Sequence, residues 1–173
     1  MQLIKNMKKF RVLFFIFILI SFHGVSQNTD SLTFKIPAIS LKTLKGTSFN
    51  SSEISNNGKP FIIIFWKSCC SPNLKMLDEI NEVYPDWQTE TGVILYAVSI
   101  DDSKNSNRIA PLVNGKGWTF EFLLDINSDF KRAMNVVATP HVFIFNGNNE
   151  LIWQKTTYNL GDSDEIYPLL KKQ

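Results

Sequence analysis

The sequence is poor in the residues that cross-link small domains or bind metals. It has two cysteines and two histidines among 173 residues, so it offers neither a disulfide framework nor a histidine-rich metal motif. The two cysteines, Cys69 and Cys70, are adjacent. A bond between neighbouring residues closes almost no chain loop and is geometrically strained, which makes this pair a poor structural disulfide. The pair is better interpreted as a reactive site.

Long apolar runs are also absent. The run over residues 12–20 is too short to cross a bilayer, which needs about 20 residues. It follows four basic residues and precedes the small-residue pattern Gly24-Val25-Ser26. This order predicts a secretory signal peptide over residues 1–26, cleaved before Gln27, and therefore an exported, periplasmic or otherwise extracytoplasmic protein. The protein would meet the membrane only through this export signal.

An excess of positive charge is missing from the rest of the chain. The full sequence carries a net charge of +2, but the four basic residues of the signal leave 14 basic and 16 acidic residues beyond it, a net charge of −2. Without a basic stripe, nucleic-acid binding is not expected. The apolar content of 44% is that of a globular protein, so residues 27–173 are predicted to form one domain. We expect a monomer without a cofactor.

The centre of the chain has the pattern of a strand, a helix and a second strand. Phe61–Trp66 is a continuous apolar run typical of a strand buried on both faces. From Pro72 onward, apolar residues recur every three or four positions, which predicts a helix that Pro85 kinks or ends. A second buried strand follows at residues 93–98. This βαβ pattern predicts parallel strands in an α/β domain.

Shorter elements are predicted on either side of this unit. In chain order they are a hairpin turning at 45–47, a helical turn at 52–54, a helix at 106–113, a loop at 114–117, a strand at 118–124, a helix at 127–134, a hairpin over 142–153 and a final helix at 163–171. For the final helix, Asp162 and Glu165 predict a variant of the capping box.

The cysteines fall at the point where the first buried strand gives way to the helix. A thiol at a helix N-terminus faces unpaired backbone N–H groups and the positive end of the helix dipole. Both stabilise the thiolate, which is the nucleophilic form of cysteine. The sequence therefore predicts a nucleophilic sulfur at the start of the helix.

Four local segments, together with the order of elements, resemble the thioredoxin superfamily, specifically the exported thiol-disulfide oxidoreductases of the TlpA/ResA type. The segments are 36–46 with 58–60, then Phe65-Trp66-Lys67-Ser68, then Val98-Ser99-Ile100-Asp101, and finally Val136 through Thr139-Pro140. The resemblance covers most of residues 27–173. It implies a thioredoxin-like fold, in which a central mixed sheet carries helices on both faces and an N-terminal β-hairpin.

The redox motif departs from that family in two places. The family motif is Trp-Cys-x-Pro-Cys, and the aligned residues here are Cys69-Cys70-Ser71-Pro72-Asn73. The resemblance makes Cys70 the attacking cysteine and leaves Asn73 in place of the resolving one. The acidic residue of the family would fall at Met76. Cys70 alone would form mixed disulfides that an external thiol releases; the alternative is that Cys69 acts as the resolving thiol through a vicinal disulfide.

The resemblance also implies a substrate-binding surface. Its members in this sequence are Trp66, Pro72, Asn73, Thr139 and Pro140. The Thr139–Pro140 bond would be cis, and the backbone of Thr139 would pair with an extended peptide beside Cys70. The alternative is an ordinary proline at the opening of an edge strand.

Three functions remain open from the sequence. The first is monothiol-type thiol-disulfide exchange through Cys70, an enzymatic activity with protein thiols or disulfides as partners and an external reductant. The second is a catalytically degenerate module that binds peptides or a partner protein. The third is Cu(I) handling by Cys69, Cys70 and His141, although their spacing matches no metal motif. Peroxidase chemistry is not favoured, because the pattern Pro-x-x-x-Thr/Ser-x-x-Cys is missing.

Overall fold

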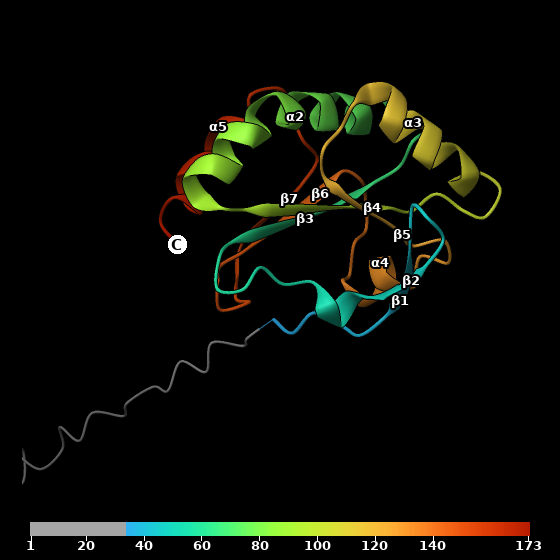
Figure 1. Ribbon diagram of the computed structural model, residues 1–173, viewed down its shortest axis with the longest axis horizontal. Helices are drawn as coiled ribbons and strands as arrows, with labels where there is room; N and C mark the ends of the chain where they lie inside the picture. The colour runs from blue at the N-terminus through green and yellow to red at the C-terminus, as the bar shows by residue number, and fades with distance from the viewer. Residues whose placement is uncertain (1–33) are drawn as a thin grey trace, which may run out of the picture. The chain divides into compact units, whose positions relative to one another are not determined.

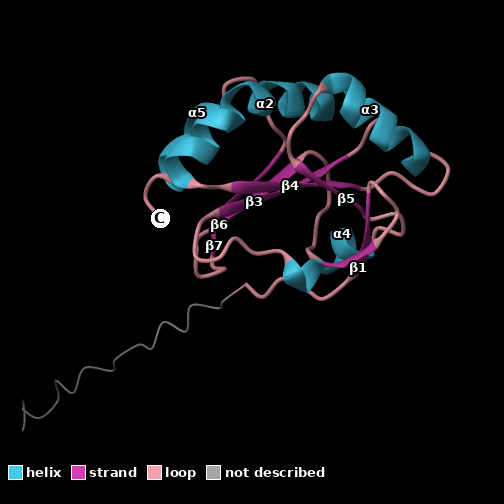
Figure 2. Cartoon of the chain, viewed as in Figure 1, coloured by secondary structure: helices cyan, strands magenta, loops and turns pink. Residues whose placement is uncertain are grey.

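The computed structural model describes residues 34–173, so the predicted signal peptide lies outside the described residues. Seven strands form one mixed sheet in the order β2-β1-β5-β4-β3-β6-β7 (Figure 2). The strands are β1 (Ser40–Thr43), β2 (Ser48–Asn50), β3 (Phe61–Trp66), β4 (Ile94–Ser99), β5 (Glu121–Leu124), β6 (His141–Phe145) and β7 (Leu151–Thr156). The hairpin of β1 and β2 extends the sheet beyond β5, which confirms the N-terminal hairpin.

The middle of the sheet is parallel. Strand β4 pairs in parallel with β3 and with β5, whereas β6 pairs antiparallel with β3. All six residues of β3 are buried, as expected for a central strand covered on both faces. The predicted βαβ unit is confirmed, and its first strand leads directly to the cysteines.

Helices cover both faces of the sheet. They are η1 (Ser51–Glu53), α2 (Ser71–Thr91), η2 (Ser106–Arg108), α3 (Ile109–Lys116), α4 (Asp129–Ala133) and α5 (Ser163–Leu170). Figure 1 shows α2, α3 and α5 on one side of the sheet and α4 on the other. Among residues 34–173, no helix combines the length and the apolar character that a membrane span requires.

Alternate residues of β3 belong to two different core clusters. Ile62, Ile64 and Trp66 pack beneath α2, α3 and α5. Phe61, Ile63 and Phe65 point to the other face, where they join α4 and the hairpin residues. Because successive side chains of a strand point to opposite faces, this one strand is held from both sides. The segment that follows Trp66 therefore starts from a fixed position.

Helix α2 continues through Pro85 to Thr91, so of the two predicted effects of this proline, a kink or an end, the helix end is wrong. A proline inside a helix removes one backbone hydrogen bond. Tyr84, directly before the proline, and Trp87, two residues after it, are buried in the core. Burial of two aromatic side chains stabilises the helix by more than the single missing hydrogen bond costs. Tertiary packing therefore overrides the local signal of the proline.

Two smaller predictions are also wrong. The predicted loop at 114–117 belongs mostly to α3, which ends at Lys116 with Gly117 in the left-handed conformation as its C-cap. The predicted capping box of α5 does not form. The carboxylate of Asp162 instead accepts a hydrogen bond from the N–H of Asn159 at 2.8 Å and forms an ion pair with Lys155.

Candidate redox site

Cys70 is the N-cap residue of α2. Its backbone is extended, and its carbonyl oxygen accepts hydrogen bonds from the N–H groups of Asn73 at 3.0 Å and Leu74 at 3.4 Å. Pro72 lies in the first turn, where a missing N–H leaves no helical hydrogen bond unmade. The proline and the change from strand to helix together place Cys70 at the start of the helix, as the sequence predicts.

A buried carboxylate braces the turn between β3 and α2. Asp101 follows β4 and is 2% exposed. It accepts hydrogen bonds from the backbone N–H of Ser68 at 2.9 Å, from the hydroxyl of Ser68 at 2.7 Å and from the hydroxyl of Ser99 at 2.8 Å. Sequence reasoning missed this brace, whose only signal is a carboxylate at the carboxyl end of the neighbouring parallel strand. The brace fixes the backbone immediately before the two cysteines.

The two cysteine thiols are free and lie against each other. The Sγ atoms of Cys69 and Cys70 are 3.3 Å apart. The side chain of Cys69 is exposed and that of Cys70 is half-buried. Both sulfurs are therefore accessible from outside the protein, and each lies within contact distance of the other.

The contact between the thiols changes the expected acidity of Cys70. The hydrogen bond with the Cys69 thiol, together with partial burial, raises the pKa of Cys70, and the positive charge of Lys67 partly opposes this rise. A negative charge on one sulfur also opposes a negative charge on its neighbour. The thiolate stabilisation predicted from the helix start alone is therefore incomplete, because the contact with Cys69 acts in the opposite direction.

The predicted substrate-binding residues of β3 and α2 differ in accessibility. Pro72 is exposed beside Cys70. Trp66 and Asn73 are both 0% exposed, so their side chains do not line a surface. Trp66 packs edge-to-face against Trp118 in the core, with ring centroids 5.7 Å apart. The assignment of Trp66 and Asn73 to direct substrate contact is therefore corrected: both lie beneath the surface.

Asn73 is buried without a hydrogen-bond partner. Neither Nδ2 nor Oδ1 of its side chain is paired within the described residues. It occupies the first turn of α2, three residues after Cys70, and residues at this spacing face each other on a helix. The buried position beneath Cys70 thus holds an amide, which cannot attack a disulfide.

The loop before β6 lies at the same edge of the sheet as the cysteines. The Thr139–Pro140 peptide bond is cis, as the resemblance implies. Strand β6 begins at His141, which pairs with Phe65 near the end of β3. Because β6 is antiparallel to β3, its first residues lie at the end of β3 that leads to Cys70. Thr139 is half-buried and Pro140 is buried.

The Cu(I) hypothesis finds no support in the geometry. Within residues 34–173, no three or more histidine, cysteine, aspartate or glutamate side chains form a group that could hold a metal ion. Cys69, Cys70 and His141 therefore do not come together as the hypothesis requires. His141 stacks on Phe143, and its Nε2 lies 3.2 Å from Oε1 of Gln154. Burial lowers the pKa of His141.

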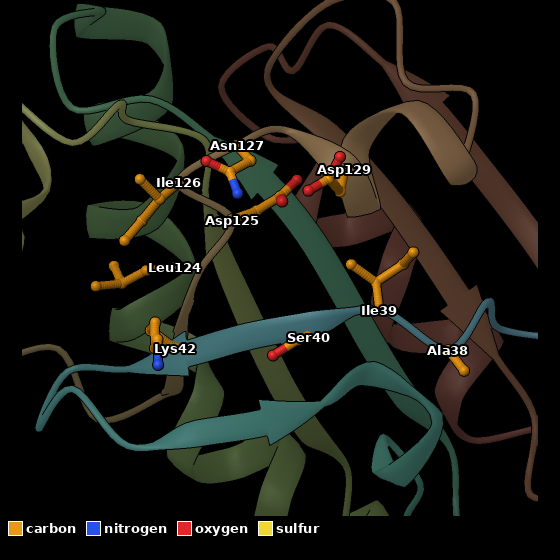
Figure 3. A pocket seen from close by; sticks show the side chains of 9 residues that line it. All are labelled: Ala38, Ile39, Ser40, Lys42, Leu124, Asp125, Ile126, Asn127 and Asp129. Atoms are coloured by element: carbon orange, nitrogen blue, oxygen red, sulfur yellow. The ribbon is translucent and has the colours of Figure 1, made fainter.

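A cavity of about 520 Å³ opens beside the end of β5 (Figure 3). Its lining residues are Ala38, Ile39, Ser40, Lys42, Leu124, Asp125, Ile126, Asn127 and Asp129. The Asp125 carboxylate is buried, and burial raises its pKa. Its two oxygens accept the backbone N–H groups of Phe130 and Lys131 at the start of α4. Since this carboxylate already caps α4 and no cysteine lines the cavity, the cavity is not part of the thiol site.

Residues 33–154 match the model of the AhpC/TSA family. The chain belongs to the AhpC/TSA family. This member is 29% identical over 115 residues to the thiol-disulfide oxidoreductase ResA of Geobacillus kaustophilus, and the match covers 66% of this chain. It spans 63% of the length of ResA, which is less than two thirds.

Solved structures support the same assignment. A thioredoxin-like protein from Porphyromonas gingivalis is 46% identical, with a TM-score of 0.71, over 80% of this chain and 90% of that one. StoA from Bacillus subtilis is 21% identical, with a TM-score of 0.61, over 77% of this chain and 97% of that one. The solved structures confirm the thioredoxin-like fold, and the family match together with the ResA relative confirms the resemblance to the TlpA/ResA type.

Proposed function

We propose that this AhpC/TSA member carries out thiol-disulfide exchange through Cys70, outside the cytoplasm, on protein thiols or disulfides. The observation that carries the proposal is the free, half-exposed thiol of Cys70 at the first residue of α2. Relatives named thiol-disulfide oxidoreductases support the same chemistry. The predicted signal peptide supports the location.

In this reaction the Cys70 thiolate attacks a substrate disulfide, forms a mixed disulfide with one half and releases the other half as a thiolate. The Asp101 brace holds the preceding turn, which positions the sulfur. The backbone of Thr139 would pair with the substrate chain beside Cys70. Release of the mixed disulfide needs a second thiol, because Asn73 cannot attack it. An external thiol would supply this step in a monothiol cycle.

A catalytically degenerate binding module is the second candidate. The observation that favours it is the raised pKa of Cys70, since a protonated thiol is a weak nucleophile. In this alternative the surface around Pro72 and Thr139 binds a peptide, and no covalent step follows.

The pH dependence of Cys70 alkylation separates the two candidates. The experiment uses the reduced protein with Cys69→Ser, which removes the neighbouring thiol that raises the pKa of Cys70. Lys67, which lowers that pKa, remains. We expect a titration midpoint below about 8.5, the ordinary value of a free cysteine, and a lower midpoint than in the wild-type protein.

Two lysine variants control for the local charge. Lys67→Gln, added to Cys69→Ser, should raise the midpoint, whereas Lys45→Gln in the turn between β1 and β2 should leave it unchanged. A midpoint at or above about 8.5 in the Cys69→Ser protein would contradict the exchange proposal and favour the binding module.

A further inference from the structure

Release of the mixed disulfide on Cys70 needs a second thiol. Position 73, one helical turn after Cys70, does not supply it, but another thiol lies in contact with Cys70. Asn73 fills the position one helical turn after Cys70. Cys69 precedes Cys70, and its Sγ lies 3.3 Å from the Cys70 Sγ. Reacting atoms held about 3–3.5 Å apart are in the range of a near-attack arrangement. The geometry of the reduced protein already brings the two sulfurs to this range.

We propose that Cys69 is the resolving thiol of this protein, so that the redox couple is the adjacent pair Cys69 and Cys70. This inference rests on the proposed exchange through Cys70 and assigns its second step. Cys70 first forms the mixed disulfide with the substrate. The Cys69 thiolate then attacks the Cys70 sulfur, forms the Cys69–Cys70 disulfide and expels the substrate sulfur as a thiolate.

The protons and electrons balance over these two steps. The two protein thiols lose their protons to solvent and two electrons to the substrate disulfide, which leaves as two thiols after protonation. An external thiol or dithiol then reduces the Cys69–Cys70 disulfide and returns the protein to its starting state. The only co-reactant is therefore the external reductant that the exchange already needs.

The loss of charge in the first step favours the second attack. While both cysteines are reduced, a thiolate at one of them opposes a second thiolate at the other. The mixed disulfide of Cys70 carries no negative charge, so this opposition ends as soon as the first step is complete. Cys69 is exposed, so solvent can take its proton directly. The first step thereby favours the second.

The exposure of Cys69 also distinguishes it from position 73. A thiol at the buried position of Asn73 would be shielded from other thiols, whereas Cys69 can meet them. Local attack nevertheless has the advantage, because well-oriented neighbouring groups react as if present at very high concentration. Resolution by Cys69 should therefore precede attack by external thiols at ordinary concentrations.

Oxidised glutathione tests the assignment, with intact-mass measurement after an acid quench. The reduced wild-type protein should lose both thiol hydrogens and keep no glutathione. Cys69→Ser and Cys69→Ala should each accumulate one glutathione per protein, on Cys70, with a lifetime at least about tenfold longer than in the wild type. Ser71→Ala, which changes the other neighbour of Cys70, should behave as the wild type does.

The possible failures are distinguishable. A wild-type adduct as long-lived as that of Cys69→Ser, with no internal disulfide, would overturn the role of Cys69 and leave exchange through Cys70 intact. Absence of any adduct on Cys70 in both Cys69 variants would overturn the proposed exchange and the resolving role together. An adduct in Cys70→Ser but in neither Cys69 variant would show that the two cysteines have the opposite roles.

Discussion

Replacing Asn73 by leucine should stabilise the protein, although the position lies beside the proposed catalytic thiol. The Asn73 side chain is 0% exposed, and neither of its polar atoms has a partner within residues 34–173. A buried polar group without a hydrogen bond costs about 1–3 kcal/mol. Leucine has the same branching and the same number of side-chain heavy atoms and removes both polar atoms, while its larger volume costs about 1–3 kcal/mol at a buried site.

Taking the middle of each range, the two unpartnered polar atoms cost about 4 kcal/mol and the added volume costs about 2 kcal/mol, so the expected net gain is about 2 kcal/mol in the free energy of unfolding. For a protein of this size, that gain raises the melting temperature by roughly 2–8 °C. Urea unfolding of the reduced proteins, followed by circular dichroism, measures the gain, and an unchanged m value shows that the two proteins expose the same surface on unfolding.

The matched control is Asn81→Leu on the same helix. The Asn81 side-chain oxygen accepts the backbone N–H of Thr119 at 3.1 Å. Removing this partnered amide should lower the stability by about 0.5–1.5 kcal/mol, the opposite sign from Asn73→Leu. If Asn73→Leu is no more stable than the wild type, the amide has a partner in solution and the reasoning is refuted.

Two further predictions address function and pH. In a Cys69→Ser background, Asn73→Cys should raise insulin reduction by dithiothreitol at least about tenfold, because a thiol one turn from Cys70 resolves the mixed disulfide. Asn73→Ser is its control, and an inert Asn73→Cys protein would mean that the site does not accept disulfide substrates. Separately, the lowered pKa of buried His141 means that the unfolded chain binds a proton near pH 6.5 that the folded chain does not. The contribution of His141 to the free energy of unfolding should therefore fall as the pH drops below about 6.5. His141→Phe should reduce the stability loss between about pH 7.5 and 5.0, and equal losses in the two proteins by urea unfolding would argue against this assignment.

The sequence predicts the scaffold of the site better than its chemistry. The limits of β3 and the start of α2 follow from the apolar run Phe61–Trp66 and from Pro72, which are local signals. Whether the helix ends at Pro85 could not be predicted, because the answer depends on the packing of the residues around the proline. The orientation of Trp66 was not predictable, because a strand buried on both faces lacks the polar alternation that identifies the surface side.

The interactions that set the reactivity of the site join side chains whose positions no pattern specifies. Asp101 reaches Ser68 across 33 residues, and this contact exists only because β3 and β4 are neighbours in parallel. The contact between the two thiols depends on side-chain rotamers at adjacent residues. The place of the pair in the chain predicts that it is reactive, whereas the direction of the Cys70 pKa shift depends on the distance between the two sulfurs.

An exposed resolving thiol at Cys69, in place of a buried one at position 73, changes where an external reductant can attack the disulfide. With a cysteine at position 73, one sulfur of the disulfide would lie beneath the surface, and a reductant would have to attack the other. In a Cys69–Cys70 disulfide, the exposed side is Cys69. Attack there releases Cys70 as the thiolate, which is the nucleophile of the next cycle. Cys69 would then resolve the mixed disulfide in one turnover and receive the reductant before the next, so the reductant need not reach the backbone of Thr139, where the substrate chain would pair.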